Sequence, residues 1–158
     1  MTEEGNLFHV YSLSDAKPRP VVSRLQLARV RSVFLLRLSL AAVFFWFGVL
    51  KLTGVSPVVD LLNNTFPYLA HSPCIELLGL AEMAIAVGLI VDRLSKYAAA
   101  LMILHLFGTL SVIYVAPSLI FAPAFPVLTM TGEFIVKNFV FIIAGLVVVE
   151  SRKRKSDD

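Results

Sequence analysis

Cysteine and charge are both scarce in this chain of 158 residues. The single cysteine, Cys74, excludes an internal disulfide and any cysteine pair for thiol–disulfide exchange within the chain. Only 16% of the residues are charged and 58% are hydrophobic, where soluble domains have about 25% and about 45–50%. A small water-soluble domain leaves too much surface wet to hide so many apolar side chains, and disordered chains are poor in them. Lipid must therefore be the solvent for most of the chain.

Four long apolar runs predict an all-α membrane protein, a four-transmembrane-helix bundle. At a rise of about 1.5 Å per residue, each run is long enough to cross a hydrocarbon layer of ~30 Å. The runs show no alternation of polar and apolar residues, which excludes the strands of a membrane barrel. The expected helices cover residues 33–51, 73–91, 96–115 and 133–149. They form a membrane domain, residues 32–149, between a basic N-terminal segment, 1–31, and a basic tail, 150–158.

The Lys and Arg residues are distributed unevenly about these helices. Twelve of the 14 belong to the N-terminal side, the turn at 92–96 or the C-terminal tail, and only Lys51 and Lys137 belong to the other side. Because cytoplasmic loops carry the excess of Lys and Arg, this bias predicts that both termini are cytoplasmic.

The two connections on the outer side are unusually apolar. Residues 56–69 have the spacing of a short helix that lies in the membrane interface. The segment 115–131 contains three prolines and no charge. One interpretation is that this segment packs over the outer mouth of the bundle or dips into it. The other is a surface loop that faces lipid.

Two ionisable residues, Glu82 and His105, fall inside the expected spans, where charge is costly enough to indicate a functional site. Each lies nine residues past the start of its span, at Pro73 or Lys96. At ~13.5 Å from their own faces, they meet near the middle of the bilayer on antiparallel helices. Small residues on the same helix faces, such as Gly108 beside His105, indicate close packing there. The pair is then either structural, fixing the helix register, or a proton relay or ligand site.

Four charges form a second candidate site at the outer rim: Lys51, Glu76, Glu133 and Lys137. Glu133 and Lys137 are one helical turn apart, with the acid first, which favours an ion pair. The four charges sum to zero, so one interpretation is a closed network at the mouth of the bundle. The alternative is four separately solvated interfacial charges. We expect Lys137 to lie deepest of the four.

The sequence offers no residues for several other chemistries. Haem held by two histidines needs both at membrane depth, but His71 is at the rim and His9 is in the N-terminal segment, which leaves only His105. Metal-site spacings, nucleotide-binding loops and Ser/His/Asp groupings are absent from the sequence. We therefore predict no catalytic residue, no metal site and no haem.

Three blocks of the sequence resemble the DoxX-like superfamily, and within it the YkgB-type membrane proteins, which include a reactive-chlorine resistance protein. The blocks are LRLSLAAVFFWFGVLKLTG (36–54), HSPCIELLGLAEMAIAVGLIV (71–91) and PVLTMTGEFIVKNFVFIIAGL (126–146). Their motif positions are Arg37, Trp46, Gly48, Lys51, Ser72, Pro73, Glu82, Gly132, Phe134, Lys137 and Asn138. The chain departs from the resemblance at Asn138, where an acid is common, and in its shorter second block.

This resemblance implies a multi-pass protein of the bacterial inner membrane that is linked to redox or envelope stress. The first interpretation is an accessory or quinone-associated subunit without catalytic machinery of its own, which acts with a redox-enzyme partner or a second copy of itself. The alternative is a small transporter or proton-coupled permease that uses Glu82 and His105. The basic residues flank apolar runs, as juxtamembrane charge does, so no nucleic-acid partner is expected.

The orientation can be tested with Cys74, which opens the second expected helix on the side that is poor in Lys and Arg. We expect a membrane-impermeant maleimide to label Cys74 in intact cells, because that side is predicted to be outside. Labelling that requires the cytoplasmic side to be opened would contradict the predicted orientation.

Overall fold

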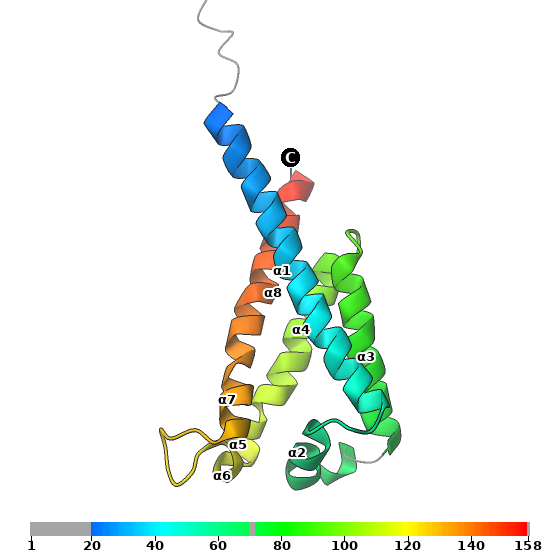
Figure 1. Cartoon of the computed structure of the whole chain (residues 1–158), viewed down its shortest axis with the longest axis vertical. Helices are drawn as coiled ribbons and strands as arrows, with labels where there is room; N and C mark the ends of the chain where they lie inside the picture. The colour runs from blue at the N-terminus through cyan, green and yellow to red at the C-terminus, as the bar shows by residue number, and fades with distance from the viewer. Residues whose placement is uncertain (1–19, 70–71, 158) are drawn as a thin grey trace, which may run out of the picture. The chain divides into compact units, whose positions relative to one another are not determined.

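The computed structural model describes residues 20–69 and 72–157, and its regular elements there are helices, with one isolated bridge between Phe121 and Leu128. The elements are α1 (Pro20–Leu52), α2 (Val58–Thr65), the 3-10 helix η2 (Pro67–Leu69), α3 (Ser72–Ile90), α4 (Ser95–Leu110), α5 (Val112–Val115), α6 (Pro117–Ile120), α7 (Met130–Val136) and α8 (Asn138–Asp157) (Figure 1). The chain divides into two compact units at Ser32 and Val33, and the bundle is the second unit, Val33–Asp158.

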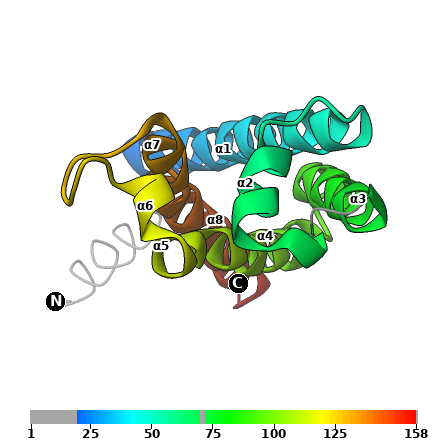
Figure 2. The same cartoon turned by 90° about the horizontal axis from the view of Figure 1, so that it is seen from below.

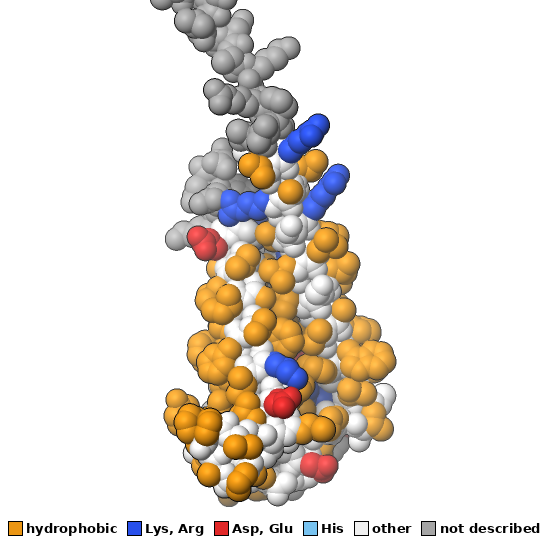
Figure 3. Space-filling model, turned by 60° about the vertical axis from the view of Figure 1, so that its left-hand side comes forward, with side chains coloured by type: hydrophobic (Ala, Val, Ile, Leu, Met, Phe, Trp, Pro, Cys, Tyr) orange, Lys and Arg blue, Asp and Glu red, His pale blue; other side chains and the backbone are white. Residues whose placement is uncertain are grey.

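Four helical stretches in the described residues are long and apolar enough to cross a membrane, which confirms the predicted four-helix fold. They are Arg24–Leu52, Pro73–Ile90, Ser95–Val115 and Met130–Arg152. The third stretch combines α4 with α5, and the fourth combines α7 with α8. Hydrophobic side chains cover most of the face of the bundle seen in Figure 3, as expected for a surface that faces lipid.

The first and last helices are longer than the apolar runs alone predict. α1 begins at Pro20, well before residue 33, because proline suits the first position of a helix and the following residues are mostly good helix formers. α8 continues to Asp157 through the basic tail, where Lys and Arg favour helix and complement the dipole of its C-terminus. The apolar pattern marks the part of each helix in lipid, whereas the helix itself ends where capping and propensity end it.

Small residues set the close contacts between the helices. A Cβ added to Gly88 of α3 would lie 2.8 Å from Cβ of Ala98 of α4, and one added to Gly145 of α8 would lie 2.7 Å from Cε of Met102. At Gly88 a larger side chain would clash with Ala98, and at Gly145 it would displace the end of the Met102 side chain, so both glycines allow close packing of the helices. Around these contacts pack fully buried side chains, which include Phe44, Ile85, Leu89, Met102 and Val148.

Two glycines allow α1 and α3 to approach each other closely. A Cβ on Gly48 would lie 2.7 Å from the carbonyl oxygen of Gly79, and a Cβ on Gly79 would lie 2.9 Å from the carbonyl oxygen of Gly48. Any side chain at either position would push the two helices apart. Past this contact α1 ends in a Schellman motif, in which Gly54 has a φ of 73° and Val55 N–H donates to the carbonyl of Leu50 at 3.2 Å.

The two apolar connections differ in what they cover. α2 forms the short helix expected in residues 56–69, with Leu62 buried, and it lies across one end of the bundle (Figures 1 and 2). The segment 115–131 instead folds back on the start of α7. The Thr129 hydroxyl accepts from Gly132 N–H at 2.9 Å and donates to the Leu119 carbonyl at 2.6 Å, and Ile120 is fully buried. Phe125 on the same segment is 78% exposed, so one part packs on the bundle and another faces outward.

A charged cluster joins three helices at the turn between α3 and α4. Arg37 of α1 is buried and donates to the carbonyls of Leu89 and Ile90 at 2.8 and 2.9 Å and to Asp92 at 2.7 Å. Arg152 of α8 also bonds to Asp92. Arg37 thus satisfies carbonyls at the C-terminal end of α3, where a cation also complements the helix dipole.

Asp92 makes the stability of this cluster dependent on pH. The hydrogen bonds from Arg152 and then Arg37 hold the pKa of the Asp92 carboxyl well below its usual range. A lowered pKa in the folded state adds stability above the unfolded pKa of about 3.9, and this stability is lost as the pH falls through the folded value. Asp92→Asn should therefore lower the thermal midpoint at pH 7. The loss in free energy of unfolding should be no more than about 1 kcal/mol, because the carboxylate is exposed.

The difference between Asp92→Asn and the wild type should shrink as the pH is lowered below about 4. Asp60→Asn changes an exposed acid on α2 and serves as the control. A difference that stays constant down to pH 2, or the same difference for Asp60→Asn, would contradict the assignment.

Candidate functional site

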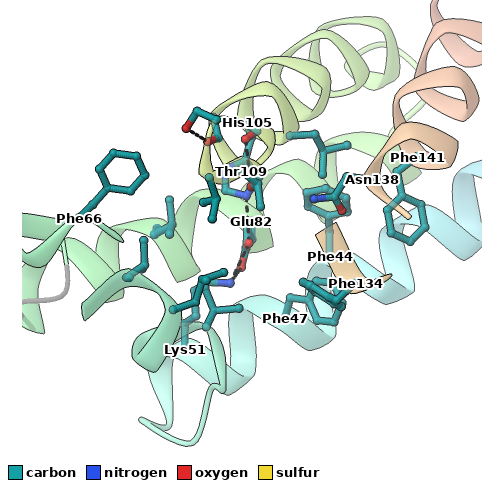
Figure 4. A pocket seen from close by; sticks show the side chains of 18 of the residues that line it. Phe44, Phe47, Lys51, Phe66, Glu82, His105, Thr109, Phe134, Asn138 and Phe141 are labelled. Carbon is teal, nitrogen blue, oxygen red and sulfur yellow. Dashed lines mark hydrogen bonds and ion pairs between the residues drawn. The ribbon is translucent and has the colours of Figure 1, made fainter. Parts of the chain in front are cut away.

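A buried carboxylate connects three helices at the centre of the candidate site (Figure 4). Lys51 of α1 donates to both carboxylate oxygens of Glu82 of α3, with Nζ 2.9 Å from Oε1 and 2.6 Å from Oε2. Nε2 of His105 on α4 lies 3.1 Å from Oε1. The structure therefore brings Glu82 and His105 together and adds a cation to them. We refer to these three residues as the Lys51–Glu82–His105 triad.

The side chain of Lys51 points into the span, away from the nearer helix end. Cα–Cβ bonds of a helix tilt toward its N-terminus, so a long side chain near the C-terminal end of α1 leans back along the helix. The Cβ atom of Lys51 lies 3.0 Å from where a Cβ on Gly79 would be, and Glu82 follows Gly79 by about one turn. The side chains of Lys51 and Glu82 are only 3% and 4% exposed.

The predicted rim cluster of four charges is therefore wrong, because Lys51 does not belong to it. Lys51 belongs to the buried triad, not to a network at the mouth of the bundle. Glu133 and Lys137 form a separate pair at 3.8 Å, and their side chains are 61% and 68% exposed. Glu76 is exposed on the first turns of α3. Lys51, and not Lys137, is the buried cation of the four, because the position of a residue along a helix does not say which way its side chain points. The depth of Lys137 in the bilayer stays a prediction.

His105 is held from two sides. Its ring meets the ring of Phe44 edge to face, with centroids 6.0 Å apart. Because an ionised carboxylate only accepts hydrogen bonds, Nε2 carries the hydrogen in its contact with Glu82. The side chain of His105 is 17% exposed, more than either other member of the triad. His105 is thus the most accessible member of the triad.

A cavity of about 370 Å³ lies beside the triad, which forms part of its wall (Figure 4). Most of the wall is apolar, and α2 covers part of it with Val58, Leu61 and Leu62. Its aromatic side chains come from four parts of the chain and are Phe44, Phe47, Phe66, Phe134 and Phe141. Among the described residues, none of the segment 115–131 contributes to the wall. The cover of the cavity is α2 and not the proline-rich connection.

Asn138, the first residue of α8, adds a polar group to this wall. The residue is 3% exposed, and within the described part of the chain its Nδ2 atom has no hydrogen-bond partner. A buried donor without a partner costs about 1–3 kcal/mol, so such atoms are rare in native proteins. The sequence singled out Asn138 only as a departure from the family pattern, since nothing in the sequence shows that it is buried.

Three further motif positions, Arg37, Gly48 and Trp46, have structural roles or face outward. Arg37 satisfies carbonyls at the end of α3, and Gly48 allows the close contact with α3. Trp46 is 64% exposed on the outside of the bundle. Gly108 was expected on a packed face, but a Cβ there would meet no atom within 4 Å. Within the described residues, no three His, Cys, Asp or Glu side chains are arranged to hold a metal ion.

Comparison with known proteins gives one match. The DoxX family model matches residues 32–116, which is more than half of the chain and contains the whole triad. Asn138 and α8 lie beyond the matched residues. Comparison with curated proteins and with solved structures found no match.

Because Lys51 is buried and Lys137 is exposed, the same substitution should destabilise the protein much more at Lys51 than at Lys137. Lys51→Met leaves the buried Glu82 carboxylate without its cation, and removing one partner of a buried pair costs roughly 3–5 kcal/mol. Lys137→Met removes an exposed pair that contributes about 1 kcal/mol or less. Unfolding of both variants in the same detergent measures the difference. An equal loss, or a larger loss for Lys137→Met, would show that the triad does not stabilise the bundle.

Proposed function

The chain belongs to the DoxX family, and from its site we propose that it is a quinone-associated accessory subunit of the bacterial inner membrane. In this proposal the cavity beside the Lys51–Glu82–His105 triad binds the ring of a lipid-soluble quinone. The subunit acts in redox or envelope-stress defence together with a redox-enzyme partner, and it has no catalytic machinery of its own. Within the family we assign it to the YkgB-type branch, from the motif positions of its first and last helices.

The observation that carries this proposal is the character of the cavity wall. Small-molecule sites are concave, mostly apolar and of about 300–1,000 Å³, with a few polar groups that fix orientation. The cavity has about 370 Å³, an aromatic wall and a small set of polar side chains. Aromatic rings pack well against a flat ring in offset or edge-to-face geometry. A quinone supplies a flat apolar ring with oxygen atoms at two ends, which fits such a wall.

The charges of the wall also favour a neutral ligand. Lys51 and Glu82 compensate each other at hydrogen-bond distance, so neither is available as an unpaired charge for an ionic ligand. When quinone is bound, its own chemistry is the uptake and release of electrons and protons. In the proposal the chain positions the ring and excludes water from it, while Glu82 and His105 hold a proton at Nε2.

A second candidate function is a small proton-coupled permease. Its support is the position of His105, which contacts a buried carboxylate, lines the cavity and is partly exposed. Ionisable groups within spans are typical of proton relays. The two candidates differ in one measurement, because a permease moves protons across sealed liposomes and an accessory subunit does not. Proton flux that is lost in Glu82→Gln would favour the permease.

Gly108 offers a direct test of ligand binding in the cavity. It lines the cavity and is exposed, and a Cβ added there would meet no protein atom within 4 Å. We expect Gly108→Leu to weaken binding of a short-chain ubiquinone in nanodiscs by about tenfold, which is 1.4 kcal/mol. The purified wild type should also yield quinone in its lipid extract.

The matched control is Ala100→Leu, which adds a similar side chain to an exposed position of α4 outside the cavity wall. This variant should bind like the wild type. The proposal fails if the wild type binds no quinone above empty nanodiscs, or if Gly108→Leu binds as well as Ala100→Leu.

A further inference from the structure

We propose that Asn138 is the specificity-determining donor of the cavity, and that its amide selects neutral ring ligands that carry a carbonyl oxygen. This inference rests on the proposed function, because it concerns recognition in the same cavity. It names the atom that makes the contact, Nδ2, and the chemical group that this atom recognises.

The other polar side chains of the cavity wall already have hydrogen-bond partners. Lys51, Glu82 and His105 bond to one another. Thr109 donates to the carbonyl of His105 at 3.3 Å, and Ser111 donates to the carbonyl of Gly108 at 2.5 Å. In the described chain, the buried side-chain atom left without a partner is Nδ2 of Asn138. A ligand therefore finds a donor at Asn138 without breaking a bond within the protein.

The position of Asn138 directs this donor at a ring. Phe44 and Asn138 both line the cavity, and Figure 4 shows the Asn138 amide on the same side of the cavity as Phe134 and Phe141, away from Lys51. The Phe134 ring is itself fixed against Phe47, with centroids 5.6 Å apart. A flat ring among these phenylalanines brings an oxygen on its edge to the amide. The aromatic wall and the amide thus recognise two parts of one molecule.

The chemistry of the amide defines the class of ligand. An amide N–H donates to an acceptor and carries no charge, so it does not offset the loss of water around an anion. The wall has no uncompensated cation to do so, because Lys51 is paired with Glu82. The preferred group is therefore a neutral acceptor, and a ring carbonyl provides one with two lone pairs. A hydrocarbon ring of the same shape leaves the amide without a partner.

Two probes of the same shape test this selection. Duroquinone and durene share a six-membered ring with four methyl groups, and durene lacks the two carbonyl oxygens. One hydrogen bond contributes about 0.5–1.5 kcal/mol net, so the wild type should bind duroquinone about threefold to tenfold more tightly than durene. Binding is measured with the full chain in nanodiscs, after subtraction of partitioning into empty nanodiscs.

Two variants remove the donor and differ in how much of the space of the Asn138 side chain they fill. Asn138→Leu keeps the branched shape and the number of heavy atoms of the side chain, and Asn138→Ala leaves more space. Both should lose the preference for duroquinone, and Asn138→Leu should melt no lower than the wild type without probe, because it removes an unpaired buried group. Lys137→Met, at the neighbouring exposed position, should keep the preference.

The outcomes separate this inference from the function on which it rests. If the wild type binds neither probe, the cavity is not a ligand site and both proposals fail. If the wild type binds both probes equally, or if Asn138→Leu and Asn138→Ala keep the preference, the assignment of Asn138 is overturned while the cavity remains a ligand site. A preference that disappears in both variants and persists in Lys137→Met supports the assignment.

Discussion

The carboxylate of Glu82 lies within a membrane span, and the arrangement of the surrounding helices depends on compensating its charge. An isolated charge in an apolar medium is too costly to be kept without a partner. Lys51 supplies the opposite charge, and His105 supplies a further hydrogen bond. Lys51 can do so only because Gly48 and Gly79 let α1 and α3 approach each other closely. Compensation of one charge thus determines the contact between two helices and the position of a third.

The same compensation explains why a largely apolar cavity can exist beside the charges. A cavity that contained an unpaired carboxylate would bind cations or water and not a neutral ring. Because Lys51 and Glu82 neutralise each other, the surrounding phenylalanines determine the character of the wall. α2 covers part of the cavity at one end of the bundle. Charge pairing and apolar recognition are therefore parts of a single arrangement.

The four spans could be predicted from the sequence, and so could the proximity of Glu82 and His105, since both follow from helix geometry and from the short connection between two helices. Helix rise gives the depth of a residue, and the short turn at 92–96 makes α3 and α4 neighbours. The role of Lys51 could not be predicted in this way, because it depends on the direction of its side chain and on the contact between α1 and α3. The burial of Asn138 likewise depends on how α8 packs against other helices. The depth of a residue along its helix follows from local structure, whereas the ion pair of Lys51 and the burial of Asn138 depend on the tertiary structure.

The contacts of Lys51 and Arg37 together determine the register of α1 against α3. Arg37 meets the carbonyl of Leu89, and Gly48 meets Gly79. From the first contact to the second, α1 advances eleven residues and α3 returns ten, as expected for two antiparallel helices of equal rise. A slip of one turn would move Arg37 away from the end of α3 and Lys51 away from Glu82 at the same time. Each contact therefore opposes the slip that would break the other, and the buried charge is held in place by contacts along the whole helix pair.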